Sequence, residues 1–223
     1  MDTKSQALDK RNKTIQKLII KIIPVIQKNG FSTLKMDDAA KYMDISKATM
    51  YKYFASKDEI IDAIVGRYVD YISEMVQDWS LTDNMSYVKS FDKVFQQSLL
   101  MAVYLSDIFL QELGNLYPHL YDRLSNEVEV RNEQVREFFD LGMKNDVFQR
   151  LNPVILLIQM DTMLRKMIDP KLLMLHHLSL KQALSDYYQV MRHQIMKSEF
   201  INIENSSEMD LFLNQMVQKL SRQ

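Results

Sequence analysis

Residues 31–61, FSTLKMDDAAKYMDISKATMYKYFASKDEII, decide the fold of the first part of the chain. Their pattern predicts two short helices, at about 35–43 and 47–54, which are joined by the tight connection Asp44-Ile45-Ser46. Ser46 suits the N-cap of the second helix, because its hydroxyl can accept a backbone N–H from the first turn. Two short helices joined in this way are typical of the helix-turn-helix, a DNA-binding motif.

Longer helices are predicted on both sides of this motif. Before it, residues 8–30 carry one apolar face, and Gly30 can take the left-handed conformation that ends a helix. Pro24 removes a backbone hydrogen bond and predicts a local kink. After the motif, Ser56 and Glu59 have the spacing of a capping box, which predicts a helix that ends near Trp79.

The second short helix divides into two faces. Met50 and Phe54 are four residues apart and are predicted to point inward. The outward positions are predicted to be Lys47, Ala48, Thr49, Tyr51 and Lys52. Lysine and hydroxyl groups can reach DNA phosphates, whereas the methyl groups of Ala and Thr can contact thymine methyls. The outward face is therefore the candidate for DNA binding.

The same stretch resembles the DNA-binding domain of the tetracycline-repressor (TetR) family of bacterial regulators. The matching positions are Ile45-Ser46, Thr49-Met50-Tyr51-Lys52-Tyr53-Phe54 and Ser56-Lys57-Asp58 up to Ile60, within a similarity that spans about residues 11–72. The resemblance implies phosphate contacts from Tyr51 and Lys57. It implies that the major groove is faced by Lys47, Ala48, Thr49 and Lys52. It also implies a homodimer that binds an inverted-repeat operator in double-stranded DNA and represses transcription in response to a ligand.

Several acidic residues depart from the family pattern. Asp44 stands where the family usually turns with Gly, so an Asp would have to take the left-handed conformation. Asp37 and Asp38 lie early in the first short helix, where the helix dipole favours acids but an outward Asp37 would repel phosphate. DNA contacts are therefore predicted from the second short helix. The alternative is a helical protein-interaction module whose tri-helical head does not bind DNA.

Charge is distributed unevenly along the chain. Residues 1–57 hold 12 Lys or Arg and five Asp or Glu, although the formal net charge of the whole chain is −1. A basic segment joined to an acidic remainder suggests a module that binds a polyanion. A solvated lysine face on the first helix is the alternative, and contact of Lys13 and Lys17 with the flanking DNA backbone remains open.

The rest of the chain predicts further helices. The expected segments are 86–101, 103–115, 119–141, 153–168, 178–197 and 207–221. The predicted fold class is all-α, with a helix-turn-helix domain at residues 10–72 and a helical regulatory and dimerisation domain at residues 73–223. The apolar faces of 153–168 and 178–197 could form a four-helix bundle with a second copy, or could pack within one copy.

Aromatic residues and methionines are dense between residues 87 and 143. Such side chains can line an adaptable pocket for a small apolar or aromatic effector, or can simply form the core. The candidates for ligand binding are Phe91, Phe95, Tyr104, Tyr121 and Phe138.

Other classes of function are disfavoured. The chain has no Cys, which excludes disulfides and zinc–thiolate sites. No apolar run reaches the ~20 residues of a membrane span, and no secretion signal is visible, so a cytoplasmic location without membrane contact is expected. Gly-rich phosphate loops and other catalytic motifs are missing, so no enzymatic activity, cofactor or metal site is expected.

Overall fold

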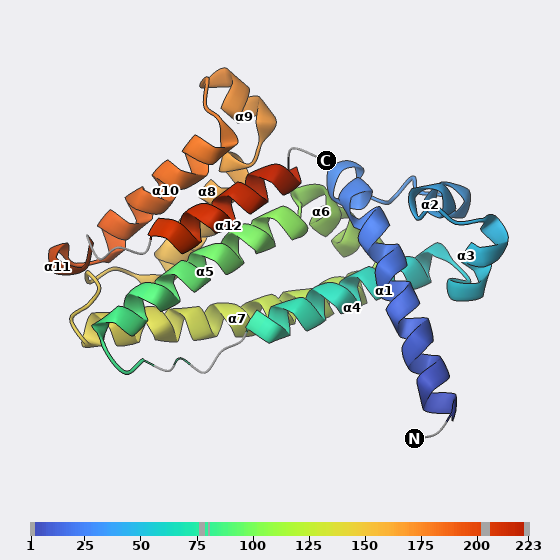
Figure 1. The fold of residues 1–223 in the computed structure, drawn as a ribbon, viewed down its shortest axis with the longest axis horizontal. Coiled ribbons are helices and arrows are strands. Elements are labelled where there is room, and N and C mark those ends of the chain that lie inside the picture. The colour runs from blue at the N-terminus through green and yellow to red at the C-terminus, as the bar shows by residue number, and fades with distance from the viewer. Residues whose placement is uncertain (1–2, 76–78, 80, 202–205, 221–223) are drawn as a thin grey trace. The chain divides into compact units, whose positions relative to one another are not determined.

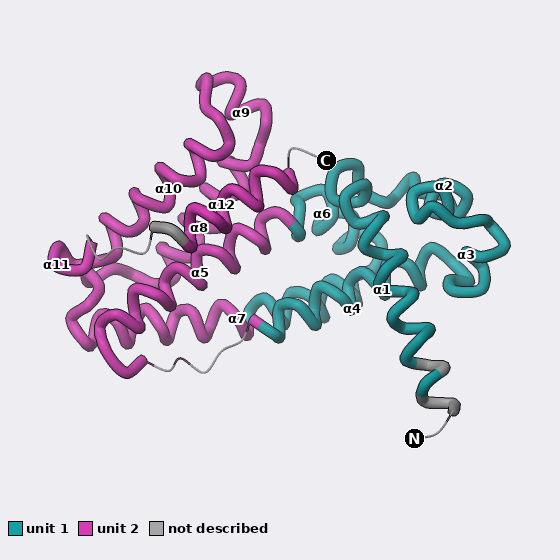
Figure 2. Tube along the Cα trace, viewed as in Figure 1, with its two compact units in different colours: residues 1–74, 104–129 teal, residues 75–103, 130–223 magenta. Residues whose placement is uncertain are grey.

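The computed structural model describes residues 3–75, 79, 81–201 and 206–220. These residues form helices joined by turns, with a single antiparallel bridge between Phe148 and Met196 (Figure 1). The all-α prediction is therefore confirmed. The chain divides into two compact units, residues 1–74 with 104–129 and residues 75–103 with 130–223 (Figure 2).

The first unit contains the predicted helix-turn-helix. Its helices are α1 (Thr3–Asn29), α2 (Met36–Tyr42), α3 (Lys47–Tyr53), α4 (Lys57–Met75) up to residue 74, α6 (Asp107–Leu116) and the start of α7 (Pro118–Lys144). Helices α2 and α3 lie within a residue of their predicted bounds. Helix α1 begins earlier than residue 8, and α4 ends at Met75, so Trp79 lies outside the helix.

Gly30 ends α1 in the way that the sequence predicts. Its φ is 72°, the left-handed region, and its N–H donates to the carbonyl of Ile26 at 2.9 Å. A Cβ added at Gly30 would lie 2.6 Å from the carboxylate oxygens of Glu112. The position therefore requires glycine both for its backbone and for its surroundings.

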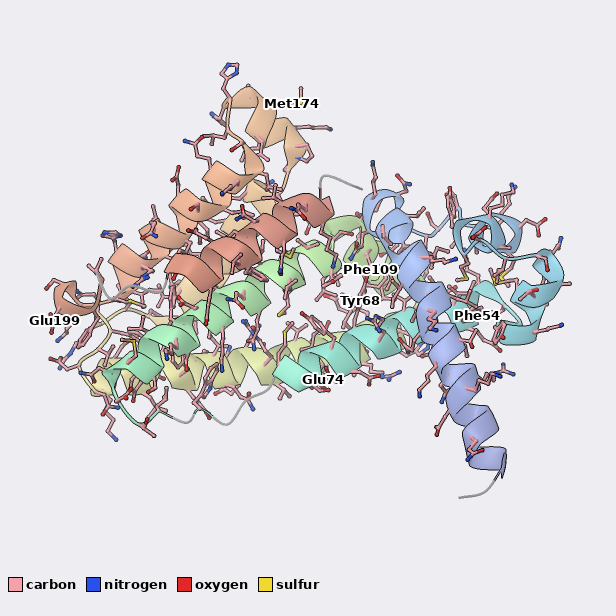
Figure 3. The ribbon with its side chains drawn as sticks, in the orientation of Figure 1. Phe54, Tyr68, Glu74, Phe109, Met174 and Glu199 are labelled. Carbon is pink, nitrogen blue, oxygen red and sulfur yellow. The ribbon has the colours of Figure 1, made fainter. Side chains whose placement is uncertain are left out.

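An aromatic cluster joins α6 to the other helices of the first unit. Phe109 of α6 is fully buried, and its ring meets those of Phe31 and Tyr68 edge-on, at centroid distances of 5.8 and 5.5 Å (Figure 3). Tyr104 lies 6.0 Å from Tyr68 in the same cluster, and Tyr117 lies 5.9 Å from Phe31. These contacts explain why the first unit also includes residues 104–129, which the sequence assigns to the regulatory domain.

The second unit is built from most of α5 (Asn84–Tyr104), the rest of α7 and the late helices. The late helices are α8 (Pro153–Met167), α9 (Pro170–Leu175), α10 (Leu180–Ile195), α11 (Ser198–Ile201) and α12 (Ser206–Leu220). The sequence interpretation missed α9 and α11. Pro170 occupies the first turn of α9, where a missing N–H costs nothing, and Asp169 caps that helix.

The expected dimer faces of α8 and α10 pack largely within the second unit. Seven of their residues are buried in the single chain: Leu164, Ala183, Leu184, Tyr187, Tyr188, Met191 and Ile195. The exposed apolar residues of these two helices are Val154, Ile155, Ile158 and Val190. These four residues offer the exposed apolar side chains of the two helices for contact with a second copy. No helix within the described residues is long and apolar enough to cross a membrane.

Candidate nucleic-acid interface

The turn between α2 and α3 is closed by Asp44 in the left-handed conformation. Its φ is 56°, as its position in place of a glycine predicts, and the following N–H of Ile45 donates to the carbonyl of Ala40 at 3.0 Å. Lys21 of α1 braces this turn. Its Nζ donates to the carbonyl of Met43 at 3.1 Å and lies 3.6 Å from the Asp44 carboxylate. Helix α1 thus fixes the turn from outside the motif.

Helix α3 begins at the predicted cap and turns the predicted face inward. The hydroxyl of Ser46 accepts the backbone N–H of Thr49 at 3.1 Å and lies 2.9 Å from the Thr49 hydroxyl. Met50 is fully buried, and Phe54, which follows the helix, is 2% exposed. Their burial holds α3 against the rest of the first unit.

The outward face of α3 is largely open to solvent. Lys47, Ala48 and Lys52 are exposed, and Tyr51 is 50% exposed. Thr49 is half-buried, and its hydroxyl already contacts the cap. The structure therefore brings together all five candidate residues of α3 and leaves four of them exposed.

Lys47 is paired with Asp37 of α2. Its Nζ lies 2.8 Å from one carboxylate oxygen of Asp37 and donates to the other at 3.0 Å. The hydrogen bond to Asp37, together with the attraction between the two charges, raises the pKa of Lys47. The sequence interpretation considered the helix dipole and the repulsion of phosphate by Asp37, but not this ion pair. The structure shows instead an acid that orients and partly neutralises the first lysine of α3.

Lys57 lies at the start of α4, apart from the candidate residues of α3. Its Nζ donates to the backbone carbonyl of Ser32 at 2.9 Å and to that of Phe31 at 3.3 Å. A lysine has three donors, so a phosphate contact from the remaining one is compatible with this position. The capping box of α4 differs slightly from the expected pattern, because Glu59 accepts the N–H of Ala55 at 2.8 Å rather than that of Ser56.

Glu112 of α6 contacts the segment between α1 and α2, and sequence reasoning missed this residue. Its carboxylate accepts the N–H groups of Phe31 and Ser32, the latter at 2.8 Å, and the hydroxyl of Ser32 at 2.6 Å. Partial burial raises the pKa of Glu112, but the hydrogen bonds from Ser32 and Phe31, with the charge of Lys57, outweigh this effect and lower it. We call Phe31, Ser32, Lys57 and Glu112 the α1–α2 junction.

The five candidate ligand residues do not form one group. Phe91, Phe95 and Phe138 are fully buried in the second unit, whereas Tyr104 and Tyr121 belong to the first. Phe91 and Phe95 contact the ring of Tyr188, and Phe138 contacts Trp79. Ordinary core packing accounts for the three buried phenylalanines, and their role in ligand binding stays a prediction.

Comparisons with known proteins find transcriptional regulators. Residues 23–64 match the family described as bacterial regulatory proteins, tetR family. The negative transcriptional regulator IcaR of the biofilm operon icaADBC, from Staphylococcus aureus, is 27% identical over 145 residues, covering 60% of this chain and 76% of IcaR. The HTH-type transcriptional regulator YvaF of Bacillus subtilis is 20% identical over 190 residues, covering 82% of this chain and 96% of YvaF.

Solved structures share the fold. The ketosteroid transcriptional regulator KstR2 of Mycobacterium tuberculosis superposes with a TM-score of 0.61 at 16% identity, over 82% of this chain and 95% of KstR2. AibR, solved with isovaleryl coenzyme A and operator DNA, gives a TM-score of 0.58 at 15% identity, over 79% of this chain and 97% of AibR. The segment that contains the capped helix-turn-helix therefore matches the tetR family of bacterial regulatory proteins, and the chain shares the fold of these solved regulators.

Proposed function

We propose that the protein is a sequence-specific transcriptional regulator that binds an inverted-repeat operator as a homodimer. The observation that carries the proposal is α3, whose outward face of Lys47, Ala48, Tyr51 and Lys52 is exposed beside a turn braced from α1. By family resemblance, Tyr51 and Lys57 bind phosphates, while Lys47, Ala48, Thr49 and Lys52 face the bases. The protein acts in the cytoplasm, without enzymatic activity of its own.

Repression in response to a ligand is the second part of the proposal. IcaR, a relative by sequence, is named a negative regulator, and AibR shares the fold and was solved with an acyl-coenzyme A and operator DNA. The helical second unit, with its dense aromatic core, is the proposed regulatory domain for a small apolar or aromatic effector. Dimerisation would use Val154, Ile155 and Ile158 of α8 with Val190 of α10, which are exposed apolar residues.

The test is selection of duplexes from a random pool by the full-length protein, followed by binding measurements with the selected sequence. We expect an inverted repeat that binds about 1,000-fold or more tightly than scrambled DNA, with affinity falling steeply as salt rises. Lys47→Ala should change the selected sequence, whereas Tyr51→Ala should weaken operator and scrambled DNA alike. Recovery of no inverted repeat would favour the alternative, a helical interaction module with a head that does not bind DNA.

The pairing of Asp37 with Lys47 gives a second prediction. Asp37→Asn should raise affinity for scrambled DNA by about 5- to 10-fold and raise operator affinity less, because an acid is removed beside the phosphates and Lys47 is released. The ratio of the two affinities, which is the specificity, should therefore fall. Fluorescence anisotropy with operator and scrambled duplexes at several salt concentrations measures both quantities.

Asp38→Asn is the matched control for this change. Asp38 is the next residue of α2 and pairs with Lys41 of the same helix at 3.1 Å, away from α3. Both ion pairs are exposed, so neither substitution should lower the melting temperature appreciably. An equal rise in scrambled-DNA affinity for both variants would show that only the overall charge matters and that the Asp37–Lys47 pair has no special role.

A further inference from the structure

Helix α1 extends past the core of the first unit. Among its side chains described from Asp9 onward, the first buried one is Leu18, and residues 9–13 are all exposed. The N-terminal turns run clear of the other helices of this unit in Figure 1. Residues 9–13 are polar on every side, so this part of α1 has no apolar face to bury.

The exposed turns carry a row of positive charges. Lys10, Lys13 and Lys17 are three and four residues apart, so they share one face of α1. All three are exposed, and none forms an ion pair within the part of the chain that the structure describes. Asp9 is the single acidic residue of α1, against seven Lys or Arg. We call Lys10, Lys13 and Lys17 the α1 lysine stripe.

Two contacts fix the α1 lysine stripe beside the helix-turn-helix. Arg11, adjacent to Lys10, donates from Nη2 to the carbonyl of Tyr53 at the C-terminal end of α3, 3.3 Å away. Lys21, one turn after Lys17, donates to the carbonyl of Met43 at the end of α2. The stripe therefore runs from the turn of the motif towards the far end of α3.

We propose that the α1 lysine stripe binds the phosphate backbone of the duplex outside the half-site that α3 contacts. This inference rests on the proposed function, because it takes DNA binding by α3 as given. A row of ammonium groups without ion pairs is opposite in charge to a row of phosphates. Lys10 and Lys17 are roughly 10 Å apart along the helix, about three base pairs of one strand. Such contacts add affinity without reading sequence.

The test compares two triple variants of the full-length protein. In Lys10→Gln/Lys13→Gln/Lys17→Gln the stripe loses its charge, and in Lys89→Gln/Lys93→Gln/Lys144→Gln three exposed lysines of the second unit lose theirs. The DNA is the inverted repeat selected by the wild-type protein, synthesised with flanks of about two or about 12 base pairs on each side. Binding is measured by anisotropy at several salt concentrations.

On the long duplex, the stripe variant should bind about 10- to 100-fold more weakly at physiological salt, and its plot of log affinity against log salt should be less steep by about 3 to 5 units per dimer. On the short duplex the stripe variant should bind with the affinity of the wild type. The control variant should bind with the affinity of the wild type on both duplexes. Lys10→Arg/Lys13→Arg/Lys17→Arg should bind like the wild type, because phosphate contact requires only the charge.

Three results would overturn the inference or its basis. Equal salt dependence of the wild type and the stripe variant on the long duplex overturns it, and so does an equal loss on both duplexes, which would place the lysines within the half-site. If the wild type selects no inverted repeat, the proposed function itself fails. Circular dichroism melting of each variant, expected to be unchanged because these lysines bury nothing, shows that all variants are folded.

Discussion

Phe109→Ala should lower the free energy of unfolding by about 3–5 kcal/mol and abolish operator binding at physiological temperature. Phe109 belongs to α6, more than 40 residues beyond the segment that matches the family description, yet its ring is fully buried against Phe31 and Tyr68. Truncation would leave a cavity where α1, α4 and α6 meet. The helix-turn-helix would then lose the packing that fixes Phe31 at the end of α1.

Urea denaturation followed by circular dichroism gives the change in stability, and hydrogen–deuterium exchange shows where it acts. Protection should fall in α1 to α4 and α6, while α10 and α12, in the second unit, keep theirs. Ile108→Ala is the matched control, since Ile108 is the neighbouring residue of α6 and is 38% exposed. Loss of protection confined to α6, with operator binding intact, would contradict a structural role of Phe109 in the DNA-binding unit.

Local chemistry explains which parts of the site could be predicted. The start of α3 follows from a serine hydroxyl three residues before the N–H that it accepts, and its inner face from the spacing of Met50 and Phe54. Asp44 was predicted to be left-handed because of its place in the turn, and its φ is 56°. Each of these features depends on residues fewer than ten positions apart.

Contacts between distant segments could not be predicted in this way. The Asp37–Lys47 pair depends on the angle between α2 and α3, which residue spacing does not specify. Glu112 lies 80 positions from Ser32 and has no local pattern that separates it from any other helical glutamate. The first unit therefore includes α6, whereas the sequence suggested a boundary near residue 72.

Glu112→Gln should lower the free energy of unfolding by about 2 kcal/mol at pH 7 and weaken operator binding about tenfold. The carboxylate accepts three donors in the α1–α2 junction, from Phe31 and from the N–H and hydroxyl of Ser32. An amide has one acceptor oxygen, and its NH₂ group would face some of these donors. The carbonyls of Phe31 and Ser32 also accept hydrogen bonds from Lys57. Movement of these two residues should therefore displace Lys57 and weaken its proposed phosphate contact.

The pH dependence separates this role from a loss of packing. The pKa of Glu112 is lowered in the folded protein, so its stabilising effect is complete above the unfolded value of 4.5 and is lost as pH falls through the folded value. The stability difference between the wild type and Glu112→Gln should therefore be constant from about pH 7 to pH 5.5 and shrink below about pH 4.5. Glu127→Gln, a change of the same charge in the first unit, should show little difference at any pH. The difference in free energy of unfolding between the wild type and Glu112→Gln could instead stay constant down to about pH 3. That result would mean that the ionised carboxylate contributes nothing to stability, and that the aromatic cluster alone holds α6 to the other helices of the first unit.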